Sequence, residues 1–348
     1  METGISVYFG SSYEENRKIV QKAGSAGVTY AFTSLHIPEE TEVNYESDMK
    51  RMLALCRENG LSLIADISPV TLEKLNCHSY DELEALGIRY LRLDFGFTAH
   101  EVVDLAKTYH VVFNASTITE QDLTDWQEAG ADFSRFTACH NFYPKRYTGL
   151  SVKRIREINS RLKGLGFTTM AFVAGNKELR GPLGEGLPTA EEHRNDQVFH
   201  NMLQLFYETG SDVVLIGDID VTEDVWERIR EFNAGYITLR AELDESCPFV
   251  MEGIHHDRPD SSEYVIRSQE SRVLKPYRSK IAGTGAMPRR VGDIFISNET
   301  YLRYNGELEI ARVGLPPDER VNVIGTVAQE DLQYLPYIRD GFGFRLFV

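Results

Sequence analysis

The chain has 348 residues, 42% of them hydrophobic and 26% charged, which is long enough for two globular domains and far from a disordered composition. Its formal net charge of −16 excludes a general nucleic-acid binder, although a local basic pocket for one phosphate group remains possible. The sequence contains no secretory signal, no apolar run of about 18 residues and no Cys-x-x-Cys pair. We therefore expect a cytoplasmic protein that does not span a membrane and whose thiols are reduced.

Up to about residue 235 the sequence alternates between short apolar runs and amphipathic stretches. Eight runs rich in Val, Ile, Phe and Tyr have the length of strands, and most are apolar on both faces, which favours parallel strands covered by helices. The predicted strands are Ile5–Phe9, Tyr30–Leu35, Leu61–Ile67, Tyr90–Phe95, Val111–Ala115, Phe133–Ala138, Thr169–Ala174 and Val213–Ile216.

The stretches between these runs carry helical patterns with recognisable ends. Asn59-Gly60 is typical of a carboxyl-terminal cap, and Thr119 before Glu120 is typical of an amino-terminal cap. The predicted helices are Glu14–Ala23, Tyr45–Glu58, Thr71–Leu75, Tyr80–Leu86, Thr98–Thr108, Glu120–Ala129, Val152–Lys163, Ala190–Thr209 and Glu223–Phe232.

Eight strand–helix units predict an α/β fold, a TIM (β/α)8 barrel over residues 1–235. A doubly wound open sheet is the alternative, and the absence of Gly-x-Gly-x-x-Gly after the first strand disfavours it.

After residue 235 the pattern changes to short strands separated by turn signals. The turn signals are Asp257-Arg-Pro259, Gly283-Thr-Gly285, Asn305-Gly306 and Pro316-Pro317. The predicted strands are Ile237–Leu243, Glu263–Ser268, Asp293–Ser297, Leu308–Val313, Val321–Val327 and Phe344–Val348, and Glu330–Tyr334 is helical. We predict a second, smaller β-rich domain over residues 236–348, a barrel or closed sandwich.

Three carboxylates stand where predicted barrel strands end, the edge at which TIM-barrel enzymes build their sites. Asp66, Asp94 and Asp218 follow the third, fourth and eighth strands. Asp66 and Asp94 lie on neighbouring strands, about 4.8 Å apart, and are the predicted catalytic pair for glycoside hydrolysis. One would protonate the leaving oxygen while the other attacks or guides water, and Asp218 could replace either. Alternatively, each could cap a helix or accept a loop amide.

Other polar residues near these strand ends are predicted to bind a sugar or an anion. The segment Cys139–Tyr147 combines amide, imidazole and aromatic groups with paired cations, which suits a polar ring that carries an anion, although a proline-broken surface loop is the alternative. The sugar-binding candidates are His36, Asn114, His140, Asn141, Tyr143 and Asn176. The phosphate-binding candidates are Lys145, Arg146 and Arg180, with Arg289 and Arg290 if the second domain covers the barrel mouth.

The loop 175–188 is long and glycine-rich, as lids over TIM barrels often are. Gly217 and the helix that opens after Thr222 fit the phosphate site that many TIM barrels have behind their last strands.

Several reaction classes are disfavoured. The predicted barrel strands contain no lysine for a Schiff base or a pyridoxal cofactor, and the chain has no P-loop and no Gly-x-Ser-x-Gly elbow. No His, Asp or Glu set has metal-ligand spacing. We therefore expect no cofactor, no metal, and chemistry carried by carboxylates.

Five motifs together resemble one bacterial family, the 6-phospho-N-acetylmuramidases. The motifs are Ile5-Ser-Val-Tyr-Phe-Gly10, Thr33-Ser-Leu-His-Ile-Pro38, Ala65-Asp-Ile-Ser68, Leu91-Arg-Leu-Asp-Phe-Gly96 and His140-Asn-Phe-Tyr-Pro144. The resemblance covers essentially the whole chain. Through Gly283-Thr-Gly285 and Val291-Gly-Asp-Ile-Phe-Ile296 it implies a cyclophilin-like second domain.

This resemblance implies a cytoplasmic glycosidase of cell-wall recycling. Its partner would be a small phosphorylated disaccharide, N-acetylmuramic acid 6-phosphate joined to N-acetylglucosamine, which it would cleave from the non-reducing end. The acetamido group could attack in a substrate-assisted mechanism, or a carboxylate could attack directly. A different phosphosugar hydrolase or lyase and a non-catalytic sugar-phosphate sensor are the alternatives, and a homodimer stays open.

Overall fold

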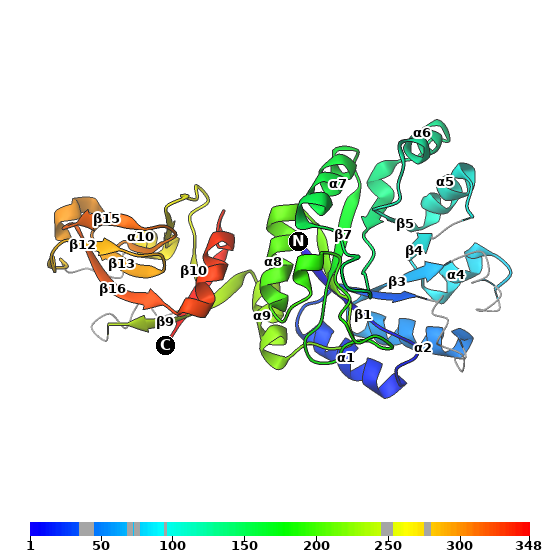
Figure 1. Ribbon diagram of the computed structural model, residues 1–348, viewed down its shortest axis with the longest axis horizontal. Coiled ribbons are helices and arrows are strands. Elements are labelled where there is room, and N and C mark those ends of the chain that lie inside the picture. The colour runs from blue at the N-terminus through cyan, green and yellow to red at the C-terminus, as the bar shows by residue number, and fades with distance from the viewer. Residues whose placement is uncertain (35–44, 68–71, 73–76, 94–95, 245–252, 275–279) are drawn as a thin grey trace. The chain divides into compact units, whose positions relative to one another are not determined.

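The computed structural model describes residues 1–34, 45–67, 72, 77–93, 96–244, 253–274 and 280–348. The chain divides into two compact units, Met1–Asn233 and Ala234–Val348. Each unit has β structure of its own (Figure 1).

The first unit is a closed barrel of eight parallel strands. β1 pairs with β2 on one side and with β8 on the other, and this closure confirms the predicted barrel and excludes the open sheet. The strands are β1 Glu2–Ser6, β2 Tyr30–Ser34, β3 Ser62–Ile67, β4 Tyr90–Leu93, β5 His110–Asn114, β6 Phe136–Cys139, β7 Thr168–Val173 and β8 Val213–Ile216.

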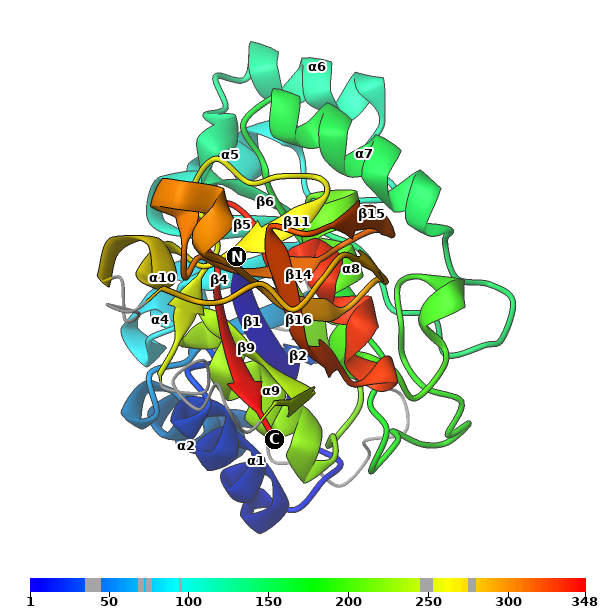
Figure 2. The same ribbon diagram turned by 90° about the vertical axis from the view of Figure 1, so that its left-hand side faces the viewer.

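Helices surround this barrel, and sequential neighbours such as α1 and α2 lie side by side (Figure 2). They are α1 Tyr13–Ser25, α2 Tyr45–Glu58, α4 Tyr80–Leu86, α5 Ala99–Thr108, α6 Glu120–Glu128, α7 Val152–Gly164, α8 Val198–Thr209 and α9 Glu223–Asn233. The predicted cap at Thr119 is confirmed, because its hydroxyl accepts from the Asp122 N–H at 3.1 Å. Gly210 ends α8 in the left-handed conformation that glycine tolerates best.

Two elements of the first unit differ from their predictions. The predicted strand Phe133–Ala138 begins as a 3-10 turn, Phe133–Arg135, because the Asp132 side chain accepts from the Ser134 N–H. The predicted helix Ala190–Thr209 is a 3-10 turn, Glu191–His193, followed by α8, which starts only at Val198.

The predicted helical piece Thr71–Leu75 lies outside the described residues except for Leu72.

The first strand lies earlier in the chain than predicted. The expected run was Ile5–Phe9, whereas β1 covers Glu2–Ser6. Val7 and Tyr8 are nevertheless buried beyond the strand end, and the Val7 N–H still donates to the Phe32 carbonyl of β2 at 2.8 Å, so the apolar pattern continues past the last residue of β1.

The second unit is rich in β structure, as predicted. A seven-stranded sheet has the order β10-β17-β9-β16-β13-β14-β11, and β12 pairs with β15 in a separate two-stranded sheet. The elements are β9 Tyr236–Leu243, β10 His255–His256, β11 Val265–Arg267, α10 Gln269–Leu274, β12 Met287–Arg289, β13 Asp293–Ser297, β14 Leu308–Ala311, β15 Leu315–Asp318, β16 Val321–Val327 and β17 Gly343–Phe347.

One predicted turn of this unit is a strand. Pro316-Pro317 lies inside β15, which pairs with β12 through Leu315 and Asp318. Proline lacks an N–H group, and it is tolerated in a strand whose ladder bonds fall on the neighbouring residues. The predicted helix Glu330–Tyr334 is part of a longer 3-10 segment, Gln329–Tyr337.

Within the described ranges, the helices are too short or too polar to cross a membrane.

Candidate functional site

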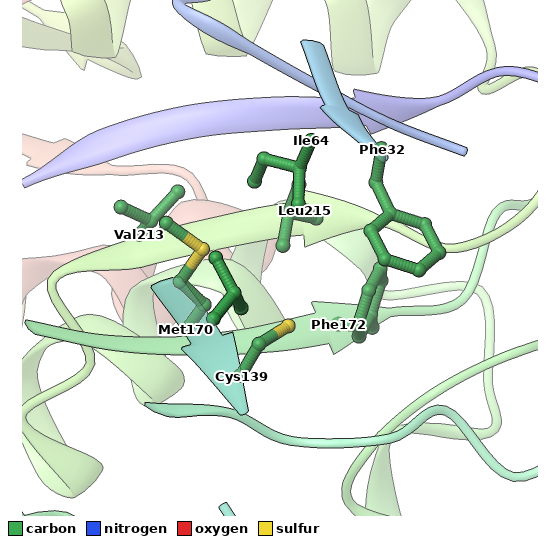
Figure 3. Close-up of a cluster of buried hydrophobic side chains, with 8 residues drawn as sticks. Phe32, Ile64, Cys139, Met170, Phe172, Val213 and Leu215 are labelled. Atoms are coloured by element: carbon green, nitrogen blue, oxygen red, sulfur yellow. The ribbon is translucent and has the colours of Figure 1, made fainter. Parts of the chain in front are cut away.

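A layer of apolar side chains fills the barrel below its carboxyl end. Phe32, Ile64, Cys139, Phe172 and Leu215 come from different strands and pack together inside the barrel (Figure 3). Side chains two residues apart on a strand point to the same side of the sheet. The positions two residues further along each strand therefore line the next layer, at the edge where TIM-barrel sites lie.

That next layer is polar on five consecutive strands. Its members are Ser34 on β2, Asp66 on β3, Arg92 on β4, Asn114 on β5 and Asn141 just after β6. Asp66, Asn114 and Asn141 were predicted from the sequence, and the alternation of the strands brings all five residues to one edge of the barrel.

Asp66 takes part in a hydrogen-bond network that joins four of these side chains. The Ser34 hydroxyl donates to Oδ2 of Asp66 at 3.2 Å, and Nη1 of Arg92 donates to the same oxygen at 3.3 Å. Arg92 also donates to Oδ1 of Asn141. The Arg92 and Asp66 side chains are only 11% and 12% exposed, so solvent screens their attraction weakly. A neighbouring guanidinium favours the ionised form of a carboxyl group, which suits Asp66 to attack or to orient a reacting group.

Arg92 is the charged member of this layer that was not predicted from the sequence. It stands between Leu91 and Leu93, which are both buried, so the run read as apolar strand. Its guanidinium carbon lies 5.6 Å from the ring centre of Phe32, inside the barrel. Arg92 could have been found from its position in the strand. It follows Tyr90 by two residues, and Tyr90 packs against the apolar layer, so the Arg92 side chain points to the same side.

Asn114 has a local contact in addition to its place in the layer. Its Oδ1 accepts from the Ser116 N–H at 3.1 Å, an arrangement that fixes the turn after β5.

His140 lies on a different face from its neighbour Asn141. It is fully buried, with Nε2 2.9 Å from Oδ1 of Asn159 on α7 and Nδ1 3.4 Å from the Ser116 hydroxyl. Burial lowers the pKa of His140 to about 4, while the contact with Asn159 acts in the opposite direction. These contacts favour a role in fixing β6 to α7 over direct contact with a sugar.

We expect the burial of His140 to make the folded protein sensitive to mild acid. Its pKa is 6.5 when unperturbed and about 4 in the fold, so its contribution to stability is complete above pH 6.5 and is lost as the pH falls toward 4. We expect the free energy of unfolding to fall by roughly 3 kcal/mol through this group over that range. His140→Gln, which cannot be protonated, should remove most of that fall. Urea denaturation of both proteins at about pH 7 and about pH 4.5 measures the difference, and equal falls would contradict the prediction.

Asp218 is buried under the loop 175–188 and holds it in place. Its Oδ2 accepts from the N–H groups of Gly175 at 2.8 Å and Leu187 at 2.9 Å, and its Oδ1 accepts from the N–H of Arg180 at 2.9 Å. Burial raises the pKa of Asp218, and the three N–H groups oppose that rise. Asp218 therefore accepts hydrogen bonds from loop amides, which is the alternative to a catalytic role given for it in the sequence analysis.

The backbone donors behind β8 are also engaged. The N–H groups of Ile219 and Asp220 donate to the Glu178 carbonyl at 3.1 and 3.2 Å. The N–H of Thr222 donates to Oδ1 of Asn176 at 3.0 Å, and Nδ2 of Asn176 donates to the Thr222 hydroxyl at 3.1 Å. These N–H groups are therefore not available to a phosphate at the site suggested before α9. Asn176 instead accepts from the backbone at Thr222, just before α9 begins.

The predicted cations of the first unit differ in their surroundings. The guanidinium carbon of Arg180 lies 4.3 Å from the ring centre of Tyr8, beyond the end of β1. Arg146 forms an ion pair with Glu185, and Lys145 is exposed on the same loop. In the part of the chain that the structure describes, neither Arg180 nor Lys145 forms an ion pair with a carboxylate, and Arg180 is the one that packs on a ring beyond the end of a barrel strand.

The remaining predicted residues lie in three places. Arg289 is buried in β12 of the second unit, where Nη2 donates to the Pro316 carbonyl at 2.6 Å, and Arg290 beside it is exposed. Tyr143 is half-buried, and its N–H donates to the Pro188 carbonyl at 3.0 Å. Asp94 and His36 lie outside the described residues and stay predictions.

The described residues include no cluster of three or more His, Cys, Asp or Glu that could hold a metal ion.

Comparison with known proteins covers both units. The family model described as 6-phospho-N-acetylmuramidase, N-terminal, matches residues 3–231, and the corresponding C-terminal model matches residues 237–347. The chain is similar to a conserved Enterococcus faecalis protein of unknown function, with 30% identity, a TM-score of 0.78, and coverage of 100% of this chain and 96% of that one. An uncharacterized B. cereus protein is 26% identical, with a TM-score of 0.74 and coverage of 100% and 99%. No curated protein matches the sequence.

Proposed function

The chain belongs to the 6-phospho-N-acetylmuramidase family, and we propose that it cleaves N-acetylmuramic acid 6-phosphate from the non-reducing end of its β-1,4-linked disaccharide with N-acetylglucosamine. The observation that carries this proposal is the carboxylate of Asp66 at the carboxyl end of the barrel, held by Ser34 and Arg92. Cell-wall recycling in the cytoplasm is the setting that we propose for this reaction.

The proposed chemistry divides between two carboxyl groups. Hydrolysis needs an acid that protonates the leaving oxygen and a group that stabilises positive charge at the anomeric carbon. We assign the second role to Asp66, which either attacks that carbon or orients the acetamido oxygen that attacks it, because Arg92 favours its ionised form. Asp94 is the proposed acid. It donates its proton as the bond from the anomeric carbon to the leaving oxygen breaks, and it recovers a proton from the water that adds.

Amide groups of the polar layer are suited to the sugar itself. We propose that Asn114 and Asn141 bind hydroxyl groups or the acetamido group of the substrate, since each amide offers both donors and an acceptor. His36 and Tyr143 remain candidates for the same role, whereas His140 and Asn176 would act by supporting the site through their contacts in the fold.

Arg180 is the proposed phosphate contact. A guanidinium that stacks on a ring still has its in-plane N–H groups for an anion. We expect Arg180→Gln to raise KM for the phosphorylated disaccharide by about 10- to 100-fold, the effect of losing hydrogen bonds to a charged group. The Kd for the unphosphorylated disaccharide, measured by calorimetry, should change little, and Arg146→Gln is the matched control on the neighbouring loop. Equal losses of affinity for both disaccharides would show that Arg180 does not recognise the phosphate.

The function is tested by incubating the full chain with the phosphorylated and the unphosphorylated disaccharide and identifying the products by mass spectrometry. Release of N-acetylglucosamine and a saturated sugar phosphate from the phosphorylated substrate alone is the expected result. An unsaturated product would indicate a lyase, and binding without turnover would indicate a sugar-phosphate sensor. Cleavage of neither substrate would overturn the proposed activity.

Two further proposals concern the whole molecule. We propose that the second unit is cyclophilin-like and that the chain forms a homodimer. Light scattering of the purified protein tests the homodimer, and a mass equal to that of one chain, 39.5 kDa, would exclude it.

A further inference from the structure

Tyr147 presents its ring to solvent from a backbone conformation that tyrosine rarely adopts. Its φ is 65°, in the left-handed region where a side chain is strained. The residue is also 89% exposed, so burial of the ring does not offset that strain. Strained residues persist where the surrounding structure imposes them, and they concentrate at sites that contact ligands.

Glu191 imposes this conformation on the loop. One carboxylate oxygen accepts from the N–H of Tyr147 at 2.7 Å, and the other accepts from the N–H of Gly149 at 2.9 Å. A Cβ at Gly149 would lie 2.7 Å from that second oxygen, so the loop approaches Glu191 as closely as a glycine allows. Hydrogen bonds from Arg194 and these N–H groups lower the pKa of Glu191 to about 2, which keeps the carboxylate ionised under ordinary conditions.

Arg194 joins this contact to the neighbouring loop. Its side chain is 8% exposed, and all five of its N–H donors are used. Two reach Glu191 at 2.9 and 2.8 Å, two reach the carbonyls of Glu185 and Gly186 at 3.0 and 2.9 Å, and one reaches the Tyr143 carbonyl at 2.8 Å. The loops that follow β6 and β7 are thus fixed to each other by contacts within the protein.

The loop that carries Tyr147 starts within the candidate site. It begins at Asn141, whose side chain accepts from Arg92 and whose carbonyl accepts from the Thr189 hydroxyl at 2.9 Å. Tyr147 therefore belongs to a loop at the carboxyl end of the barrel, where it contacts Glu191 in the segment that follows β7. Arg180, the proposed phosphate contact, lies over Tyr8 beyond β1.

We propose that the ring of Tyr147 is the platform on which the leaving N-acetylglucosamine stacks, and that Glu191 and Arg194 are the positioning residues that hold it there. The inference rests on the proposed function. A sugar ring has an apolar face of C–H groups that packs against an aromatic ring. With the phosphate at Arg180, we assign the sugar at the other end of the disaccharide to the loop that follows β6.

Three substitutions at Tyr147 separate the contribution of its ring to substrate binding from the effect of its strained backbone on stability. Tyr147→Ala should raise KM for the phosphorylated disaccharide about 10-fold with little change in kcat, and Tyr147→Phe should retain the KM of the parent protein. Tyr147→Gly should raise KM as the alanine variant does, yet raise Tm by about 2 °C because it relieves the strain. A structural role would instead lower Tm together with the loss of binding.

A shorter substrate provides the second control. The methyl glycoside of N-acetylmuramic acid 6-phosphate lacks the leaving sugar, so Tyr147→Ala and the parent protein should process it equally. If the protein cleaves neither compound, the proposed function fails, and calorimetric binding of the same two ligands still tests the platform. Equal losses for both ligands would overturn the proposal. The proposal would also be overturned if Tyr147→Ala and the parent protein differed in molecular mass by analytical ultracentrifugation. Tyr147 would then contact a second copy of the chain.

Discussion

Replacing Asp66 by asparagine is expected to lower kcat by about three orders of magnitude, the usual size of a lost catalytic carboxylate. The amide has nearly the same shape as the carboxylate, and it can still accept from Ser34 or Arg92 through its oxygen. It carries no negative charge, so it can neither attack the anomeric carbon nor stabilise the charge that develops there. Single-turnover kinetics with the phosphorylated disaccharide measures the effect on chemistry directly.

Ser34→Ala is the matched control for this substitution. It removes one hydrogen bond to the same oxygen of Asp66 and leaves the ion pair with Arg92 in place. A hydrogen bond to a charged group contributes about 1.5–3 kcal/mol, so kcat should fall by about 10- to 100-fold, less than for Asp66→Asn. If Asp66→Asn lost no more activity than Ser34→Ala, Asp66 would not be a catalytic residue and the chemistry would have to be assigned elsewhere on the rim.

The barrel could be predicted because the pattern that identifies each strand lies within a short stretch of sequence. Strands buried on both faces need apolar side chains at nearly every position, and the eight runs therefore stand out from the amphipathic helices between them. Where local interactions oppose the pattern, the prediction was wrong. A strand was expected at Phe133, but the chain forms a turn there because the Asp132 side chain accepts from the Ser134 N–H.

The candidate site could be predicted only in part, because position at a strand end does not fix the direction of a side chain. Asp66 and His140 both stand at such ends, yet Asp66 meets Arg92 inside the barrel and His140 meets Asn159 on a helix. Counting in steps of two from the apolar layer distinguishes these cases and also identifies Arg92. The contact of Glu191 with Tyr147 has no such signal, because it joins residues that are distant in the sequence and depends on how two loops fold over each other.

Among the substitutions proposed here, removal of the Asp218 carboxylate should lower the free energy of unfolding the most. Asp218→Ala leaves the N–H groups of Gly175, Arg180 and Leu187 without their acceptor. A buried donor that loses its partner costs about 1–3 kcal/mol, so the free energy of unfolding should fall by roughly 3 kcal/mol or more. Denaturation in urea measures this loss, and limited proteolysis should show earlier cleavage within residues 175–188.

Asp218→Asn separates this anchoring role from catalysis. Its oxygen can still accept from Gly175 and Leu187, and a neutral amide avoids the cost of burying the charge, the same cost that raises the pKa of Asp218. The asparagine variant should therefore be more stable than the alanine variant and should retain far more activity than Asp66→Asn. A kcat as low as that of Asp66→Asn, in a protein of unchanged stability, would instead make Asp218 a member of the catalytic pair. Asp94 would then no longer be needed as the proton donor.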